Sequence, residues 1–154
     1  MCSCDCSFYR ALITAGNFLQ PYFLLAIRLF WGWQFFKAGF GKFADISAIA
    51  GFFGNLGIPF PLISAYLAAG TEMIGGLLLL IGFASRLVAI PLIFTMLVAL
   101  FTAHYALASN IFDDPVKFVS AGPFTFLFAA LTVFVFGPGK LSVDGLIKHR
   151  KERE

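Results

Sequence analysis

The chain has 154 residues, of which 60% are hydrophobic and only 12% are charged. Soluble domains carry about 25% charged residues, so this composition excludes an ordinary soluble domain and favours one compact membrane domain. The net charge is +3, and five of the eleven basic residues follow the last apolar segment, which indicates a cytoplasmic flank rather than a nucleic-acid surface.

Residues 1–20 form a predicted N-terminal tail that holds all three cysteines, at Cys2, Cys4 and Cys6. Alternate spacing gives poor geometry for an intrachain disulfide, and an odd number leaves one thiol over. Three close thiolates could bind Cu(I) or Zn(II), because soft ligands favour these ions. The alternative is a mobile tail whose thiols have no specific function or are modified by a lipid.

The first predicted span covers residues 21–40 and contains two basic side chains. Lys37 lies near one end and can extend to the membrane surface, whereas Arg28 lies roughly 10 Å in from the start of the span. Residues 41–61 connect this span to the next. Their apolar part, residues 46–56, is too short to cross a bilayer, which predicts a short interfacial or re-entrant helix.

The second predicted span, residues 62–84, carries a single charge, Glu72, near its midpoint. Its helix is about 34 Å long, enough to cross a hydrocarbon core of about 30 Å. A carboxylate at that depth costs about 2.5–3.5 kcal/mol, so Glu72 should face protein, water or a basic partner. An antiparallel first span brings Arg28 to a similar depth, which predicts an Arg28–Glu72 ion pair. The alternative is that Arg28 reaches the headgroups alone.

Two further spans are predicted at residues 87–107 and 121–136, and a basic tail follows at residues 138–154. His104 lies near the far end of the third span. An imidazole there suits proton transfer or metal binding, and the alternative is an ordinary hydrogen-bonded packing residue. The sequence therefore predicts an all-α fold, an integral membrane bundle of four transmembrane helices with a short interfacial helix between the first two.

The distribution of lysine and arginine orients these spans. Residues 1–20, the turn at Arg86 and residues 138–154 hold seven basic residues together, whereas the two other connections hold only two. The positive-inside rule therefore predicts that both ends of the chain are cytoplasmic.

Motifs for phosphate binding, dinucleotide binding, zinc proteolysis and serine hydrolysis do not occur in the sequence. A single histidine within a span also argues against a haem protein that works alone.

Five motifs follow one another along the chain: Arg28 with Gly32, GFGKF at residues 39–43, LGIP at residues 56–59, the Glu72 segment at residues 71–87, and GPGKLSVD at residues 137–144. In this order they resemble the DoxX family of small four-helix membrane proteins of bacteria. The resemblance covers nearly everything from residue 21 to residue 147, and the cysteine segment lies outside it. It implies a four-helix domain at residues 21–137 in the bacterial inner (plasma) membrane.

Members of this family resemble subunits or accessories of membrane redox systems linked to quinones, to sulfur and thiol chemistry, or to copper. The resemblance therefore predicts a component of a membrane oxidoreductase rather than a stand-alone enzyme. The polar residues within the spans, Arg28, Glu72 and His104, are the candidate catalytic residues. A quinone or Cu(I) is the implied cofactor, with the three cysteines as candidate Cu(I) ligands. The implied partners are the lipid bilayer, a soluble or membrane oxidoreductase and a second copy of the chain, but no nucleic acid.

Two other interpretations stay open at this point. The chain could be a membrane binding or permeation module for a small solute or metal ion, without catalysis of its own, because charges inside the membrane also mark such pathways. The Arg28–Glu72 pair could also serve only to fix the register of the bundle.

Overall fold

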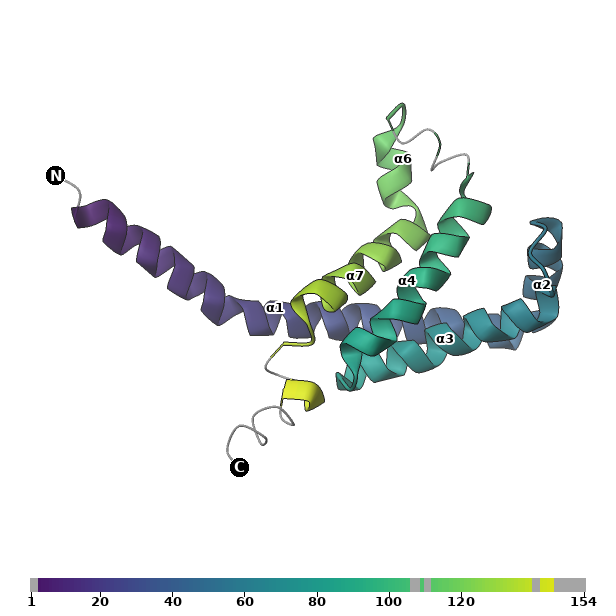
Figure 1. The fold of residues 1–154 in the computed structure, drawn as a ribbon, viewed down its shortest axis with the longest axis horizontal. Coiled ribbons are helices and arrows are strands. Elements are labelled where there is room, and N and C mark those ends of the chain that lie inside the picture. Colours follow the sequence, from purple (N-terminus) through teal and green to yellow (C-terminus); the bar gives the residue numbers. More distant parts are fainter. Residues whose placement is uncertain (1–2, 106–108, 110–111, 140–141, 146–154) are drawn as a thin grey trace.

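The computed structural model describes residues 3–105, 109, 112–139 and 142–145, and for residues 3–8 it describes the backbone alone. All regular secondary structure in these residues is helical, which confirms the predicted all-α fold (Figure 1). The helices are α1 (Ser3–Ala44), α2 (Ile46–Asn55), α3 (Pro61–Ile81), α4 (Ser85–Thr102), α6 (Pro115–Ser120) and α7 (Gly122–Phe136).

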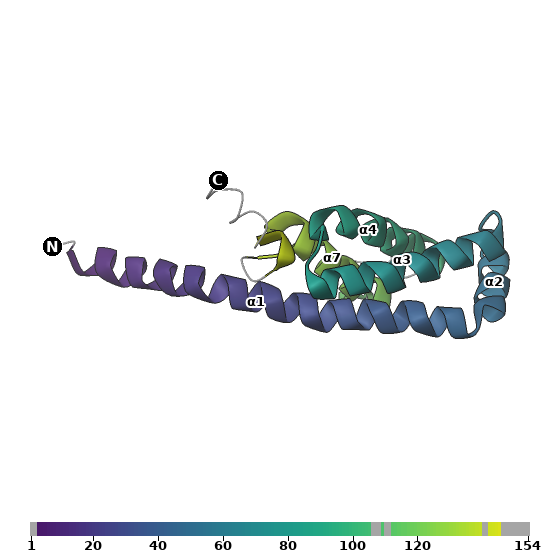
Figure 2. The same cartoon turned by 90° about the horizontal axis from the view of Figure 1, so that it is seen from below.

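Helix α1 is longer than the predicted first span. It has 42 residues, which makes it about 63 Å long, and it continues without interruption through most of the segment predicted as a tail. Pro21 lies inside it and removes one backbone hydrogen bond, and Figure 1 shows that α1 bends along its length. The N-terminal part of α1 extends beyond the other helices (Figures 1 and 2).

The four longest helices pack as two antiparallel pairs. Helix α1 packs mainly against α3, and α4 packs mainly against α7. In Figure 1 the α4–α7 pair crosses the α1–α3 pair obliquely. Contacts between α3 and α4 and between α1 and α7 join the two pairs into one bundle.

Glycines set the distance between α1 and α3. A Cβ atom added at Gly39 would lie 2.7 Å from the carbonyl oxygen of Ala69, and one added at Gly76 would lie 2.7 Å from that of Gly32. Carbon and oxygen atoms cannot approach so closely, so only glycine fits at these positions. The two backbones are therefore in direct contact, as is common where small residues line a helix interface in membranes.

Large apolar side chains fill the rest of the interior, mainly between α4 and α7. The bundle also leaves many large apolar side chains exposed on its outer faces, among them Phe23, Leu67, Leu87 and Phe94. In water such a surface would be unfavourable, whereas lipid chains cover it without cost. The buried core consists of Phe35, Leu79, Leu92, Met96, Leu100, Phe118, Leu127, Ala130 and Val133.

Length and hydropathy identify three of the described helices as able to cross a membrane: α3, α4 and the part of α1 from Tyr9 to Ala44. Helix α7 is equally apolar but has only 15 residues, so the fourth crossing stays a prediction. A short helix between the first two spans is present, as predicted: α2 has ten residues and buries none of them.

The N-terminal part of α1 and residues 142–145 both lie at the end of the bundle opposite α2 (Figure 2). These two described segments lie at one end of the bundle, which is the arrangement that the predicted topology requires. That this end faces the cytoplasm stays a prediction.

Candidate functional site

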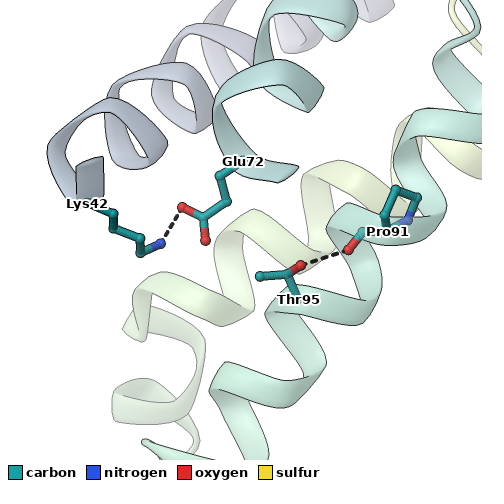
Figure 3. A network of polar contacts seen from close by, with 4 residues as sticks. All are labelled: Lys42, Glu72, Pro91 and Thr95. Carbon is teal, nitrogen blue, oxygen red and sulfur yellow. Dashed lines mark hydrogen bonds and ion pairs between the residues drawn. The ribbon is translucent and has the colours of Figure 1, made fainter. Parts of the chain in front are cut away.

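Glu72 forms its ion pair with Lys42, near the C-terminal end of α1 (Figure 3). Glu72 lies in the middle of α3 and is only 1% exposed, whereas the side chain of Lys42 is 27% exposed. We call these two residues the buried ion pair. It joins α1 to α3 across their close glycine interface.

The direction of side chains on a helix explains why these two residues meet. Helices α1 and α3 run in opposite directions, and Gly39 packs against Ala69 and Met73, so Lys42 and Glu72 differ in depth by about one helical turn. Side chains lean toward the N-terminus of their own helix. Lys42 therefore leans into the bundle, and Glu72 leans toward the level of Lys42.

The predicted Arg28–Glu72 pair is wrong. Arg28 is 2% exposed, but its guanidinium donates a hydrogen bond to the carbonyl oxygen of Pro138 and packs on the C-terminal end of α3. A Cβ atom added at Gly82, which ends α3, would lie 2.7 Å from Nη1 of Arg28. Gly82 also has a φ of 76°, a conformation that side chains other than glycine rarely adopt. Arg28 leans toward the N-terminus of α1, and hence away from Glu72.

Arg28 belongs instead to a second polar cluster, which the C-terminal segment completes. The carboxylate of Asp144 accepts hydrogen bonds from the backbone N–H groups of Ala84 (2.8 Å) and Ser85 (3.0 Å), at the start of α4. The N–H of Asp144 donates to the carbonyl oxygen of Gly82 at 3.1 Å, and its charge attracts Arg28. We call these residues, with Pro138, the Arg28 cluster. It ties α1, the α3–α4 turn and the C-terminal segment together.

The other candidate residues do not join the buried ion pair. His104 is half-buried in the turn after α4. Leu92 of α4 packs against Gly75, and His104 follows it by twelve residues, so it lies about 18 Å further along the direction of α4. The structure thus separates His104 from both Arg28 and Glu72.

The cysteine cluster is not tested by the structure. Cys2 lies outside the described residues, and Cys4 and Cys6 belong to α1 but their side chains lie outside the description. Within the part of the chain that is described, no group of three or more His, Cys, Asp or Glu residues could hold a metal ion. A Cu(I) site at the three cysteines stays a prediction.

Two residues that the sequence reasoning missed are Lys42 and Asp144. The predicted connection at residues 41–61 includes Lys42, whereas in the structure this residue of the GFGKF motif lies near the end of α1. Counting side-chain direction as well as residue depth would have identified it as the partner of Glu72. The role of Asp144 is harder to predict from the sequence, because its hydrogen-bond partners lie about 60 residues earlier.

The buried ion pair is suited to two kinds of chemistry, proton exchange and the stabilisation of charge. Glu72 is screened from lipid and from water, whereas Lys42 is partly open to the surroundings. A carboxylate and an ammonium group in such contact can exchange a proton with a molecule that binds beside them. They can also stabilise a charge that forms on that molecule, more strongly than in water.

Comparison with known proteins agrees with this architecture. The sequence model of the DoxX family matches residues 23–105. A Haemophilus influenzae protein, described as uncharacterized, is 33% identical over 129 residues, which cover 81% of this chain and 83% of the relative. The Escherichia coli "inner membrane protein YphA" is 30% identical over 132 residues, which cover 81% of this chain and 90% of the relative.

The match to a third relative covers a smaller part of both chains. The Bacillus subtilis protein named "putative oxidoreductase CatD" is 36% identical over 78 residues, which cover 51% of this chain and 57% of the relative. No solved structure matches the sequence.

Proposed function

Because the chain belongs to the DoxX family of membrane proteins, we propose that it is a membrane-embedded component of a redox system in the bacterial inner membrane. The buried ion pair of Lys42 and Glu72 is the polar centre of this proposal. The name of the Bacillus subtilis relative, an oxidoreductase, supports the redox assignment.

The observation that carries the proposal is an ion pair kept inside an apolar bundle. Replacing a buried ion pair by apolar side chains of similar volume is often neutral or stabilising, so stability alone does not require it. Glu72 and Lys42 nevertheless connect the two helices whose backbones are in contact. A charge retained at such a position is by default a functional candidate.

Proton exchange is the step that this pair would supply. A lipid-soluble carrier such as a quinone takes up protons together with electrons when it is reduced. Glu72 would hold or pass a proton beside the carrier, and the partly exposed Lys42 would stabilise the carboxylate and connect it to the membrane surface. Arg28 takes no part in this step, because it is bound in the Arg28 cluster. The electrons would come from an oxidoreductase partner.

Purification in mild detergent with partners attached tests this function. The copurified partner, bound quinone and bound metal are identified by mass and elemental analysis, and electron transfer to a short-chain quinone is measured. Glu72→Gln should lower that rate about a hundredfold or more, while the complex still assembles. Asp113→Asn is the matched control, since Asp113 is an exposed carboxylate in the turn before α6, and it should leave the rate unchanged.

Two outcomes would contradict the proposal. An assembled Glu72→Gln complex with full electron transfer would reduce the buried ion pair to a structural contact. Purification without any redox partner or electron carrier would favour the binding or permeation module instead. Metal bound in proportion to Cys2, Cys4 and Cys6 would identify a copper-linked version of the redox system.

A further inference from the structure

Lys37 lies near the middle of the bundle, although the predicted first span places it near an end. At the close α1–α3 interface, the backbone of Phe36 packs against Gly76 and that of Gly39 packs against Met73. Lys37 therefore lies at a level between Met73 and Gly76, about 5 Å from the midpoint of the 21-residue helix α3. Since α3 is about as long as the hydrocarbon core is thick, the nearer membrane surface is about 10 Å away. The extended side chain of a lysine is shorter than this distance.

The side chain of Lys37 is exposed on the outer side of the bundle. Helix α1 lies along one side of the other helices, so one of its faces is directed away from them (Figure 2). The other basic residues of this part of α1 have partners, since Lys42 pairs with Glu72 and Arg28 bonds to Pro138. Lys37 has no hydrogen bond or ion pair with the described residues. A cation in contact with lipid at this depth is unfavourable, which indicates that a molecule outside this chain pairs with it.

Lys37 belongs to a stripe of residues that is suited to contact with another helix. Phe30, Gln34, Lys37 and Gly41 follow one another at spacings of four, three and four, as along the seam between two packed helices. The amide of Gln34 also has no hydrogen bond with the described residues. A Cβ atom added at Gly41 would meet nothing within 4 Å, so a second backbone can approach there. We call these four residues the outer stripe of α1. It is about 16 Å long.

The charge of Lys37 determines what can lie on the outer stripe. The partner must provide an anion in the middle of the membrane, where an ordinary phospholipid has only hydrocarbon. A second copy of this chain does not provide one. Glu72 is the only acidic residue in the four predicted spans, and it is 1% exposed and paired with Lys42.

We propose that the outer stripe of α1 binds a transmembrane helix of a different membrane protein, and that an aspartate or glutamate in the middle of this helix pairs with Lys37. The amide of Gln34 forms a hydrogen bond with the same helix, and Gly41 lets the two backbones approach closely. This contact involves neither the buried ion pair nor electron transfer, so it goes beyond the proposed function.

Photocrosslinking in the cells that naturally produce the chain tests this docking surface. The photoreactive residue p-benzoylphenylalanine replaces Phe30, in the outer stripe, or Phe94, an exposed phenylalanine of α4 that serves as the control. Adducts are purified and identified by mass spectrometry. The Phe30 position should give an adduct with a membrane protein that has an aspartate or glutamate within a spanning helix, whereas the Phe94 position should not.

Variants test whether the charge of Lys37 makes this contact. Lys37→Met should lower the yield of the Phe30 adduct about tenfold or more, whereas Lys37→Arg should retain it. Gly41→Leu should also lower the yield, because the new side chain separates the two backbones. Lys37→Glu should abolish the adduct, and a lysine in place of the acidic residue of the crosslinked protein should restore it. Lys117→Met, at an exposed basic residue of α6, is the matched control and should change nothing.

Four results would overturn the proposal. They are adducts with lipid or with a second copy of the chain alone, equal adducts from Phe30 and Phe94, a crosslinked helix without an acidic residue, and an undiminished yield in a folded Lys37→Met protein. Thermal melting in detergent confirms that this variant is folded. Glu72→Gln should leave the adduct unchanged, so the docking surface and the role of the buried ion pair are tested separately.

Discussion

The two helix pairs of this bundle are held together in different ways. Helices α1 and α3 touch backbone to backbone at their glycines, and their interface contains the Lys42–Glu72 pair. Helices α4 and α7 keep larger side chains between them, such as Leu100 and Val133, and neither buries a charged residue along its described length. Their threonines bond back to their own helices.

This difference shows where the bundle can hold a charge. Lipid tails are as apolar as leucine, so burial of apolar side chains provides little force between helices in a membrane. Close packing and polar contacts provide it instead, and both are concentrated between α1 and α3. The α4–α7 pair contacts this interface from one side, through α4 against α3 and α7 against α1. Four substitutions, ordered from the largest expected effect to the smallest, test this contrast.

The close α1–α3 interface should not tolerate a side chain at Gly39. In Gly39→Leu the new side chain would collide with the backbone of Ala69, so we expect a loss of more than about 3 kcal/mol and little folded protein. Gly41→Leu, two residues later, meets nothing within 4 Å at its Cβ and should fold normally. Size-exclusion profiles and thermal melting in detergent measure both. Similar stability of the two variants would contradict the close packing.

Breaking the ion pair from the lysine side should cost about 3 kcal/mol in Lys42→Met, because Glu72 then stays buried without its basic partner. Glu72→Gln should cost less, since Lys42 is partly exposed and can reach the membrane surface. The double variant should recover part of the loss, which a double-mutant cycle of unfolding free energies detects. Strictly additive losses would show that the two residues do not interact.

The α4–α7 pair should respond more mildly to the loss of volume. Leu100→Ala removes a buried side chain and should cost about 2 kcal/mol, the low end of the range for soluble cores, because lipid is the alternative environment. Phe101→Ala, at a neighbouring residue that is 60% exposed, is the control and should be nearly neutral. A larger effect for Leu100→Ala than for Gly39→Leu would reverse the contrast between the pairs.

The smallest effect concerns the start of α4. Asp144→Asn leaves one acceptor oxygen where the carboxylate uses two and removes the negative charge that attracts Arg28, so it should cost about 1 kcal/mol. Hydrogen exchange at the amides of Ala84 and Ser85 should become faster, while that in the middle of α3 stays unchanged. Asp113→Asn, at an exposed turn, serves as the control. Unchanged exchange at these two amides would show that Asp144 does not cap α4.

Most of the fold could be predicted from the sequence, because hydropathy alone marks residues that lipid accepts. The predicted spans coincide closely with α3 and α7 and with most of α4. The length of α1 could not be predicted, because residues 3–20 carry too many polar groups to be assigned to a span. They are helical nevertheless, because they continue directly into the part of α1 that packs within the bundle.

The site was predicted only in part, for a geometric reason. The prediction that Glu72 is buried beside a basic residue is confirmed, but that residue is Lys42, and not Arg28, which the depth of the first span favours. Depth alone is insufficient, because long side chains lean toward the N-terminus of their own helix, so their charged ends lie at a different depth from their Cα atoms. The contacts of Asp144 depend on the folded chain as a whole, and local patterns cannot reveal them.

The cap on α4 has a consequence for biosynthesis. The carboxylate that satisfies the first amides of this helix belongs to Asp144, which the ribosome adds about 60 residues later. When α4 emerges, its first turn has no such partner, and α1 has no contact for Arg28 at Pro138. The bundle is therefore completed only after the last segment has been translated, so a truncated product would lack the contacts that close it.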